Sequence, residues 1–320
     1  MNETDEIYDV AIVGGGPAGL SAALILGRSR RSVVVVDAGQ PRNGPAAAVH
    51  GFLTRDGTPP RDLLAAARAE VAAYGVRLVD GEVAGAAAGD GGFALTLAGG
   101  GGRLAARRLL VAGGLVDELP DIPGVRELWG DQVIHCPYCH GWEAREKPIG
   151  IVASGPMATH QALLFRQLSD DVVLFAHTQP PTAEQRADLA ARDIRVIEGE
   201  VAALEVDGDG RLTGVRLATG ETVAREVVTV APRFVGRTHL LESLGVEATE
   251  HAGVGIRVAA DPTGRTEVPG VWVAGNVTDH AAQVIVAAAA GATAGAHINA
   301  DLVAEDVRRA AAAPPVGAAS

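Results

Sequence analysis

Short runs of consecutive apolar residues alternate along the chain with glycine-rich turns and with longer alanine-rich stretches. Near the start, residues 10–13 and 33–36 are such runs, and a helix-like stretch at 20–26 separates them. Runs that are apolar at every position are typical of strands buried on both faces of a parallel sheet. The pattern therefore predicts a strand–helix–strand unit and an α/β fold class.

The turn that joins the first strand to the helix has the pattern Gly-x-Gly-x-x-Gly, formed by Gly14, Gly16 and Gly19. In such turns the first glycine permits a tight bend, the second lets the backbone approach a pyrophosphate, and the third lets helix and strand pack closely. The helix N-terminus offers free N–H groups to phosphates. Asp37, at the end of the second strand, is placed to accept hydrogen bonds from a ribose. The combination predicts a dinucleotide-binding site; a glycine-rich turn that only packs is the simpler alternative.

The chain repeats this plan further along. Residues 77–84 match residues 195–202, and each copy follows a strand–turn–helix unit that begins near residue 10 or near residue 149. Self-similarity of this kind is typical of duplicated domains. We therefore predict two related nucleotide-binding domains of similar plan.

The second unit lacks part of the dinucleotide-binding pattern. In its turn, residues 153–158, alanine replaces the first and third glycines and only Gly155 remains. Its second strand, residues 172–175, is followed by Ala-His-Thr-Gln at 176–179, so there is no acid for a ribose and no arginine pair for a 2′-phosphate. The pattern predicts the fold of a nucleotide-binding domain but makes NAD(P)H binding doubtful.

Composition narrows the class of protein. The chain has 320 residues, a net charge of −12 and 48% hydrophobic residues, values typical of an acidic, soluble, two-domain globular protein. There is no basic stripe, so we expect no nucleic-acid partner. Residues 1–9 are polar and acidic, unlike a secretory signal, and the uncharged stretch 281–296 is too short and too weakly apolar to span a bilayer. We therefore expect a cytoplasmic protein without a membrane partner.

The only two cysteines, Cys136 and Cys139, form a Cys-x-x-Cys motif just before the second unit. Such a pair closes a small disulfide ring reversibly, which makes it a two-electron switch. His140 follows directly, and an imidazole takes or gives a proton near neutral pH. We predict an acid–base role for His140, with a structural histidine as the alternative. Glu143 would orient it if the segment is helical.

A zinc site is the competing interpretation of this segment, formed by His135, Cys136, Cys139 and His140. Adjacent residues rarely point into one tetrahedron, and no second Cys/His pair lies nearby. We therefore expect no metal here and keep the redox interpretation of the two cysteines.

A late motif completes the pattern. Residues 268–277 predict a turn, a strand and a glycine-containing turn, and an alanine-rich helix follows from about Gln283. Together with the first glycine-rich turn, the Val-Ala-Gly-Gly strand end at 111–114 and the Cys-x-x-Cys motif, this stretch resembles the low-molecular-weight thioredoxin-reductase-like flavoproteins. The resemblance covers nearly the whole chain and implies two Rossmann-like domains, the second inserted into the first.

The resemblance implies a discontinuous FAD domain formed by residues 1–117 and 244–320. The second, NAD(P)-binding-like domain, residues 118–243, carries the Cys-x-x-Cys motif and is inserted between these two parts. The family also implies a homodimer. We expect the segment after Glu305 to be a frayed, flexible tail.

FAD is the cofactor that the resemblance implies. We expect its contacts in the first glycine-rich turn, in the loops that follow the early strands and in the late motif, at Gly14, Gly16, Pro17, Ala18, Gly19, Asp37, Gln40, Arg42, His50, Val83, Ala112, Gly113, Gly275, Asn276 and Gln283. Arg42 and His50 lie in or near polar loops, where a surface residue without a role is the alternative.

Three motifs depart from those of ordinary reductases. The chain has Cys-Pro-Tyr-Cys-His at 136–140 where reductases carry Cys-Ala-x-Cys-Asp, and Gly275-Asn276 where they carry Gly-Asp. It also has Ala-His-Thr at 176–178 where a His-Arg-Arg cluster holds NADPH. These departures are similar to the dithiol oxidases that close disulfides in sulfur metabolites such as gliotoxin and holomycin. The resemblance implies a small dithiol substrate, with Cys136 facing it and Cys139 facing the flavin, and dioxygen as the acceptor that becomes hydrogen peroxide.

Two other functions stay open. The same residues would serve an NADPH-dependent reductase of thioredoxin or a similar protein, running in the opposite direction with the nucleotide at Gly155. A non-catalytic flavin redox sensor is the alternative of another class. No residue pattern identifies the particular dithiol.

Overall fold

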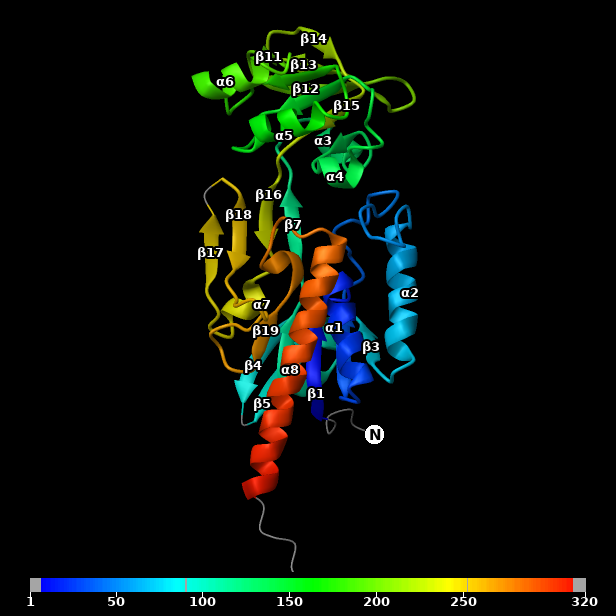
Figure 1. Cartoon of the computed structure of the whole chain (residues 1–320), viewed down its shortest axis with the longest axis vertical. Coiled ribbons are helices and arrows are strands. Elements are labelled where there is room, and N and C mark those ends of the chain that lie inside the picture. Colours follow the sequence, from blue (N-terminus) through cyan, green and yellow to red (C-terminus); the bar gives the residue numbers. More distant parts are fainter. Residues whose placement is uncertain (1–6, 90, 252, 313–320) are drawn as a thin grey trace, which may run out of the picture.

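The computed structural model describes residues 7–89, 91–251 and 253–312. Figure 1 shows two bodies of helices and strands stacked along the long axis. The two ends of the chain (blue, orange and red) build one body, and the middle of the chain (green) builds the other. This arrangement confirms the predicted fold class, an α/β protein whose second Rossmann-like unit is inserted into the first.

The first unit is organised around a seven-stranded sheet. β19 (Val271–Val273) pairs with β6, and the other strands have the spatial order β3 (Arg77–Asp80), β2 (Val33–Asp37), β1 (Ile7–Val13), β6 (Arg103–Val111), β5 (Gly92–Leu97), β4 (Val83–Gly89). The pairs among β1, β2, β3, β6 and β19 are parallel, whereas β4 and β5 form an antiparallel hairpin. The carboxyl ends of the parallel strands therefore meet at one edge, where open α/β sheets bind their ligands.

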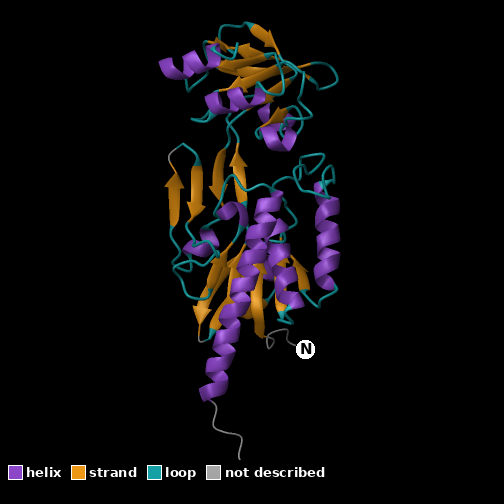
Figure 2. Ribbon diagram, in the orientation of Figure 1, coloured by secondary structure: helices purple, strands orange, loops and turns teal. Residues whose placement is uncertain are grey.

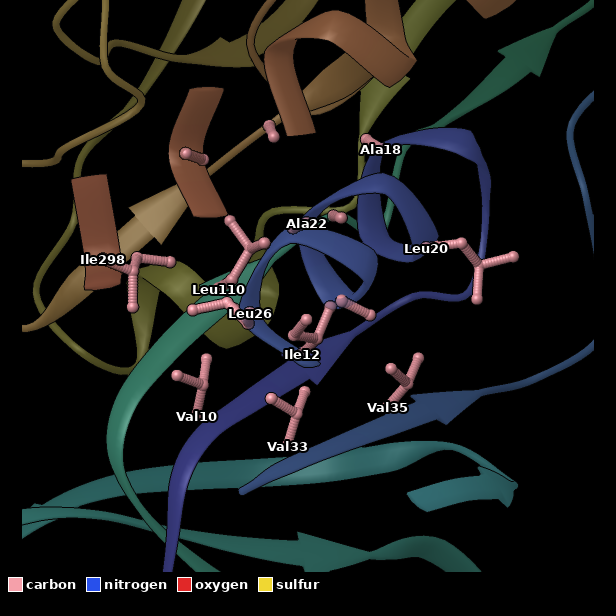
Figure 3. Close-up of a cluster of buried hydrophobic side chains, with 14 of the residues drawn as sticks. Val10, Ile12, Ala18, Leu20, Ala22, Leu26, Val33, Val35, Leu110 and Ile298 are labelled. Atoms are coloured by element: carbon pink, nitrogen blue, oxygen red, sulfur yellow. The ribbon is translucent and has the colours of Figure 1, made fainter. Parts of the chain in front are cut away.

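Helices cover one face of this sheet (Figure 2), namely α1 (Pro17–Arg28), α2 (Pro60–Ala72) and α8 (Val284–Ala312). Val10, Ile12 and Val35 point from the strands toward α1, where they join a buried cluster with Leu26 (Figure 3). Ala11, between Val10 and Ile12, belongs to a second cluster that includes residues of α7 (His239–Glu242). Both faces of the sheet are thus buried, which explains why the strand sequences are apolar at every position.

α1 and α8 pack unusually closely because glycine faces alanine between them. A Cβ atom at Gly291 of α8 would lie 1.9 Å from the carbonyl oxygen of Ala18, and one at Gly295 would lie 2.9 Å from that of Ala22. Since residues 18 and 22 face residues 291 and 295 in the same order, the two helices run in the same direction. Their N-termini therefore point to the same edge of the sheet, the edge that holds the first glycine-rich turn.

α8 is longer than expected. It is helical to Ala312, so the prediction of a frayed segment directly after Glu305 is wrong for residues 306–312, while the rest of that tail lies outside the described residues. Ion pairs explain the extension, because Arg108 binds Glu305 and Arg107 binds Asp306, each at 2.6 Å. Within the described residues, no helix is long and apolar enough to cross a membrane.

The second unit holds a five-stranded sheet of the same type. The order of its strands is β11 (Arg195–Ile197), β10 (Val172–Phe175), β9 (Ile149–Val152), β15 (Val227–Thr229), β8 (Val133–Ile134). A small antiparallel sheet and four helices complete the unit: β12 (Val201–Val206), β13 (Leu212–Leu217), β14 (Thr222–Ala224), α3 (Val125–Leu128), α4 (Pro137–His140), α5 (Ala158–Phe165) and α6 (Ala183–Ala190). β8 leads directly into the cysteine segment.

Two neighbouring strands carry the chain between the units. They are β7 (Leu115–Glu118) and β16 (Arg233–Gly236), which pair antiparallel in a four-stranded sheet with β18 (Gly255–Val258) and β17 (Ala248–His251). Residues 233–243, expected in the inserted domain, pair with these strands or pack on the first sheet through α7. We propose that the insertion ends near Pro232. Short 3₁₀ turns lie at η1 (Ala98–Gly100) and η2 (Gly275–Val277).

Candidate redox and cofactor site

The first glycine-rich turn has the backbone of a phosphate-binding loop. Gly14 has a φ of +105°, and a Cβ atom there would lie 2.4 Å from the carbonyl oxygen of Ala112. A Cβ atom at Gly19 would lie 1.9 Å from the carbonyl oxygen of Gly14. In contrast, Gly16 caps α1 and has open space on its Cβ side. Two glycines thus shape the turn, and the third leaves room for a ligand at the positive end of α1.

Asp37 lies beside this turn. Its Oδ1 accepts a hydrogen bond from the backbone N–H of Gly15 at 3.0 Å, and Arg68 lies 3.6 Å from its Oδ2. The carboxylate is only partly used by these contacts, so it retains acceptor capacity for ribose hydroxyls. Of the other expected contacts in this region, Val83 is buried at the start of β4 and Gln40 is exposed in the loop after β2.

The late motif lies at the same edge of the sheet. Ala112 and Gly113 follow β6, and Gly275 and Asn276 follow β19, which is the partner of β6. A Cβ atom at Gly275 would lie 3.0 Å from the Cβ of Ala18 in the first turn of α1. The Asn276 amide donates two hydrogen bonds of 2.9 Å to the carbonyls of residues 279 and 282, so it shapes the turn that leads into α8.

These residues fit FAD. Two helix N-termini, those of α1 and α8, face one edge of the sheet, and Asp37 and the open backbone at Gly16 lie there as well. Such an edge offers N–H donors to a pyrophosphate and a carboxylate to a ribose. Gln283 lies directly before α8, and its amide oxygen would be 3.5 Å from a Cβ atom at Gly51, in the loop after His50. The individual contacts with FAD stay predictions.

Arg42 connects the first unit to the two crossing strands. Its guanidinium donates two hydrogen bonds to Asp117 of β7, at 2.7 and 2.8 Å, and lies 5.1 Å from the ring centre of Phe234 on β16. The Phe234 ring also contacts the rings of His135 and His280, at centroid distances of 5.2 and 5.6 Å. We call these five residues the crossing cluster. Two N–H groups of Arg42 are used here, and its predicted contact with FAD stays untested.

Cys136 and Cys139 lie at the two ends of the first turn of α4. The thiol of Cys139 donates a hydrogen bond to Cys136, and this bond lowers the pKa of Cys136 to about 7, with help from the N–H groups of Tyr138 and Cys139 and from the charge of Arg42. The same hydrogen bond and burial raise the pKa of Cys139 above its usual range. In the reduced state Cys136 is therefore the thiol that ionises first, partly near neutral pH, while Cys139 keeps its proton.

His140 ends α4, and its Nε2 is a buried atom with no hydrogen-bond partner among the described residues. Burial lowers the pKa of His140, the charge of Glu143 opposes this effect, and His50 adds to it. The imidazole is therefore neutral near pH 7 and can accept a proton. Glu143 lies beyond the end of α4, so it acts on His140 from a turn and not from the same helix.

His135 has a more structural environment. Its Nδ1 lies 3.0 Å from the carbonyl oxygen of Val230 and 2.9 Å from the amide nitrogen of Gln161, which also donates to the carbonyl of His135. Burial lowers the pKa of His135. Gln161 was not predicted from the sequence, because a glutamine in an apolar helix does not indicate a role until its burial is known.

A loop of the first unit reaches this segment. His50 Nε2 lies 3.5 Å from Glu143 Oε1, and His50 Nδ1 lies 3.3 Å from Asp56 Oδ2. His50, expected to contact FAD, thus bridges two carboxylates instead of standing free. Asp56 was missed, because nothing in the sequence relates it to the cysteines.

The second glycine-rich turn differs from the first. Ser154 Oγ accepts a hydrogen bond from the N–H of Ala231 and lies 3.3 Å from the carbonyl oxygen of the same residue. Gly253, between β17 and β18, lies close to this loop, since a Cβ atom added there would lie 3.3 Å from a ring carbon of Pro156. His177, at the position expected for a ribose or phosphate ligand, accepts a hydrogen bond from the N–H of Val201. The loop is thus partly covered and internally bonded.

Known proteins share this plan. The family model for pyridine nucleotide-disulphide oxidoreductases matches residues 8–292. Thioredoxin reductase tcpT of Claviceps purpurea is 31% identical over 283 residues, 85% of this chain and 87% of that protein. Thioredoxin reductase aclD of Aspergillus oryzae is also 31% identical, over 84% of this chain and 88% of that protein. The crystal structure of HlmI has a TM-score of 0.90 and 48% identity, covering 97% of this chain and 98% of that one.

Proposed function

Since the chain belongs to the pyridine nucleotide-disulphide oxidoreductase family, we propose that it is a dithiol oxidase, which closes a disulfide in a small sulfur metabolite and passes the electrons to dioxygen. It is a thioredoxin-reductase-like flavoprotein, and its cofactor is FAD. The observation that carries the proposal is the difference between the two glycine-rich turns. The first is open and has Asp37 beside it, whereas the second has no acid and contacts the β17–β18 turn at Pro156.

The reaction at the cysteines is a thiol–disulfide exchange. A substrate thiolate attacks the sulfur of Cys136, the Cys136–Cys139 bond breaks, and the electron pair of that bond goes to Cys139. The second substrate thiolate then attacks the substrate sulfur of the mixed disulfide and displaces Cys136. The substrate loses two electrons and two protons, and the cysteine pair gains the two electrons.

The protein environment favours this sequence of steps. Cys136, with a pKa of about 7, is a good leaving group in the second displacement. His140 is neutral, directly follows Cys139 and has no hydrogen-bond partner for Nε2 among the described residues, and we assign to it the role of accepting a thiol proton. When bound, FAD supplies the two-electron chemistry between the cysteine pair and dioxygen.

Oxygen uptake with a panel of small dithiols, with and without NADPH, tests the proposal. We expect dithiol-dependent uptake with formation of hydrogen peroxide, independent of NADPH and abolished in Cys136→Ser. A flavin-loaded wild-type protein that consumes no oxygen with any dithiol would contradict the oxidase function and favour a redox sensor. A second readout, the mass of the protein in solution, tests the expected homodimer.

The names of the two relatives favour one competing function, reduction of thioredoxin or a similar protein by NADPH. Anaerobic addition of NADPH separates it from the oxidase. We expect the flavin absorbance at about 450 nm to persist, because the second turn lacks the residues that hold a ribose or a 2′-phosphate. Rapid bleaching would show that the protein is a reductase.

A further inference from the structure

The loop from His50 to Asp56 reaches from the first unit to the cysteine segment of the second. Asp56 uses both of its carboxylate oxygens there: Oδ1 accepts the N–H of Gly51 at 2.9 Å, and Oδ2 lies 3.3 Å from His50 Nδ1. With one ring nitrogen held in this way, the other nitrogen of His50 points to Glu143, 3.5 Å away. The imidazole is therefore held between two carboxylates that belong to different units.

These groups lead from the buried side of the site toward solvent. His140 Nε2 is buried without a partner among the described residues, and Glu143 follows three positions later. The side chain of Glu143 is 47% exposed, that of His50 is 23% exposed, and that of Asp56 is 67% exposed. His50 thus lies between two carboxylates that both reach solvent, and Asp56 is the more exposed of the two.

The proposed reaction, on which this inference rests, needs such a path. A dithiol substrate gives up two protons while the cysteine disulfide takes up two electrons. Cys139 retains one proton because its hydrogen bond to Cys136 and its burial raise its pKa. Cys136, with a pKa of about 7, retains the other only in part near neutral pH. In a large share of turnovers a proton therefore leaves the site while the cysteine pair is reduced, and a proton returns when dioxygen becomes hydrogen peroxide, so that no net proton is released.

We propose that Glu143, His50 and Asp56 form a proton-release path from His140 to solvent, in which His50 is the positioning residue that joins the two carboxylates. The proton moves from the substrate thiol to His140, then through Glu143 and His50 to Asp56 and water. No electrons move along the path. The groups that face His50 are Asp56 on its own loop and Glu143 on the cysteine segment. The charge of His50 in turn lowers the pKa of His140.

The experiment uses His50→Gln, which keeps hydrogen-bonding groups but cannot be protonated, in the FAD-loaded full chain. Oxygen uptake with dithiothreitol is measured between about pH 6 and pH 9, with and without added imidazole. We expect turnover to fall about tenfold at the acid end and the deficit to shrink as pH rises, because hydroxide and buffer then remove the proton. Added imidazole should restore most of the lost turnover.

His297→Gln is the matched control, because His297 is exposed on α8 far from the cysteine segment in the sequence; its pH profile should equal that of the wild type. Asp56→Asn serves as a second test if His50→Gln binds FAD poorly, and it should show the same pH-dependent deficit to a smaller degree. A loss that is equal at every pH and insensitive to imidazole, or no loss in either variant, overturns the path. A wild type without dithiol-dependent uptake overturns the proposed function instead.

Discussion

The two glycine-rich turns have the same place in their units and different surroundings. The first turn follows β1 and has open space at Gly16 and a carboxylate at Asp37. The second follows β9; its serine is bonded to Ala231, and a turn of the other unit contacts Pro156. A helix N-terminus follows each of the two turns, so the helix dipole alone does not make a nucleotide-binding site. An accessible backbone and a ribose ligand are needed as well.

The largest expected effect comes from adding one methyl group to each turn. Gly14→Ala should weaken FAD binding about a hundredfold, because a φ of +105° is strained for alanine and the added Cβ meets the Ala112 carbonyl at 2.4 Å. Gly155→Ala, with the nearest atom at 3.0 Å, should change FAD affinity less than about twofold. Titration of the apoprotein with FAD measures both. Equal losses would show that the two turns do not differ as described.

The acidic end of β2 provides the next comparison. Asp37→Asn should weaken FAD binding about tenfold, because hydrogen bonds from hydroxyls to a carboxylate are stronger than those to an amide. His177→Asn is its counterpart in the second unit, and asparagine tolerates the φ of +42° found there. We expect that variant to retain wild-type FAD affinity and activity. If the Asp37→Asn protein binds FAD with wild-type affinity, the carboxylate of Asp37 does not contribute to the predicted site.

The crossing cluster tests the proposal that the second turn does not take NADPH. Arg42→Ala removes the paired bonds to Asp117 and the contact with Phe234, and should lower the free energy of unfolding by ~1 kcal/mol. Arg42→Lys keeps the positive charge but not the planar guanidinium group, so its free energy of unfolding should fall less than that of Arg42→Ala.

NADPH should still fail to bleach the flavin of Arg42→Ala under anaerobic conditions, because the acid and the arginines remain missing. Denaturant unfolding and a flavin spectrum give the two readouts. Bleaching in Arg42→Ala, but not in the wild type, would mean that the packing of the crossing cluster and not the missing ligands keeps NADPH out.

The smallest expected effect concerns the redox pair that lies between the two turns. The pKa of Cys136 is lowered to about 7, so its thiolate fraction rises with pH and levels off above that value. Alkylation of the reduced protein by iodoacetamide should therefore have a midpoint near pH 7 and modify Cys136 first. In Cys136→Ser the remaining Cys139 loses the hydrogen bond and the charge of Cys136 but stays buried, so it should still react at higher pH than Cys136 does in the wild type. A single midpoint at the value of a free thiol would contradict the hydrogen bond between the two sulfurs.

Much of the first site can be read from the sequence because its signals are local. The spacing of Gly14, Gly16 and Gly19 predicts the turn, and Asp37 follows at the distance that one strand–helix–strand unit requires. Similarly, the pairing of Cys136 with Cys139 is evident because two residues separate them. The limits of the insertion and the end of α8 could not be read in this way, since they depend on strand pairing by β16 and on ion pairs with Arg107 and Arg108.

Local sequence patterns do not predict the contacts between segments that are distant in the chain. Arg42 and His50 were expected to contact FAD, with a surface residue without a role as the alternative. In the structure Arg42 binds Asp117, and His50 lies between Asp56 and Glu143. Asp56 itself carried no signal. The sequence does not indicate where the side chain of a loop residue points. Its direction is set by the packing of the folded chain.

The sequence by itself determined the two Rossmann-like units and the pairing of Cys136 with Cys139, because these depend on apolar period, glycine position and short spacing. It also determined the family, through the resemblance of its motifs to those of known proteins. The tertiary structure alone decided which polar groups surround His140, how the second turn is covered at Pro156 and which thiol carries the lower pKa. These properties arise where the loop 50–56, the strands β7 and β16 and the cysteine segment meet. Their electrostatics depend on distances of a few ångströms between residues far apart in the chain.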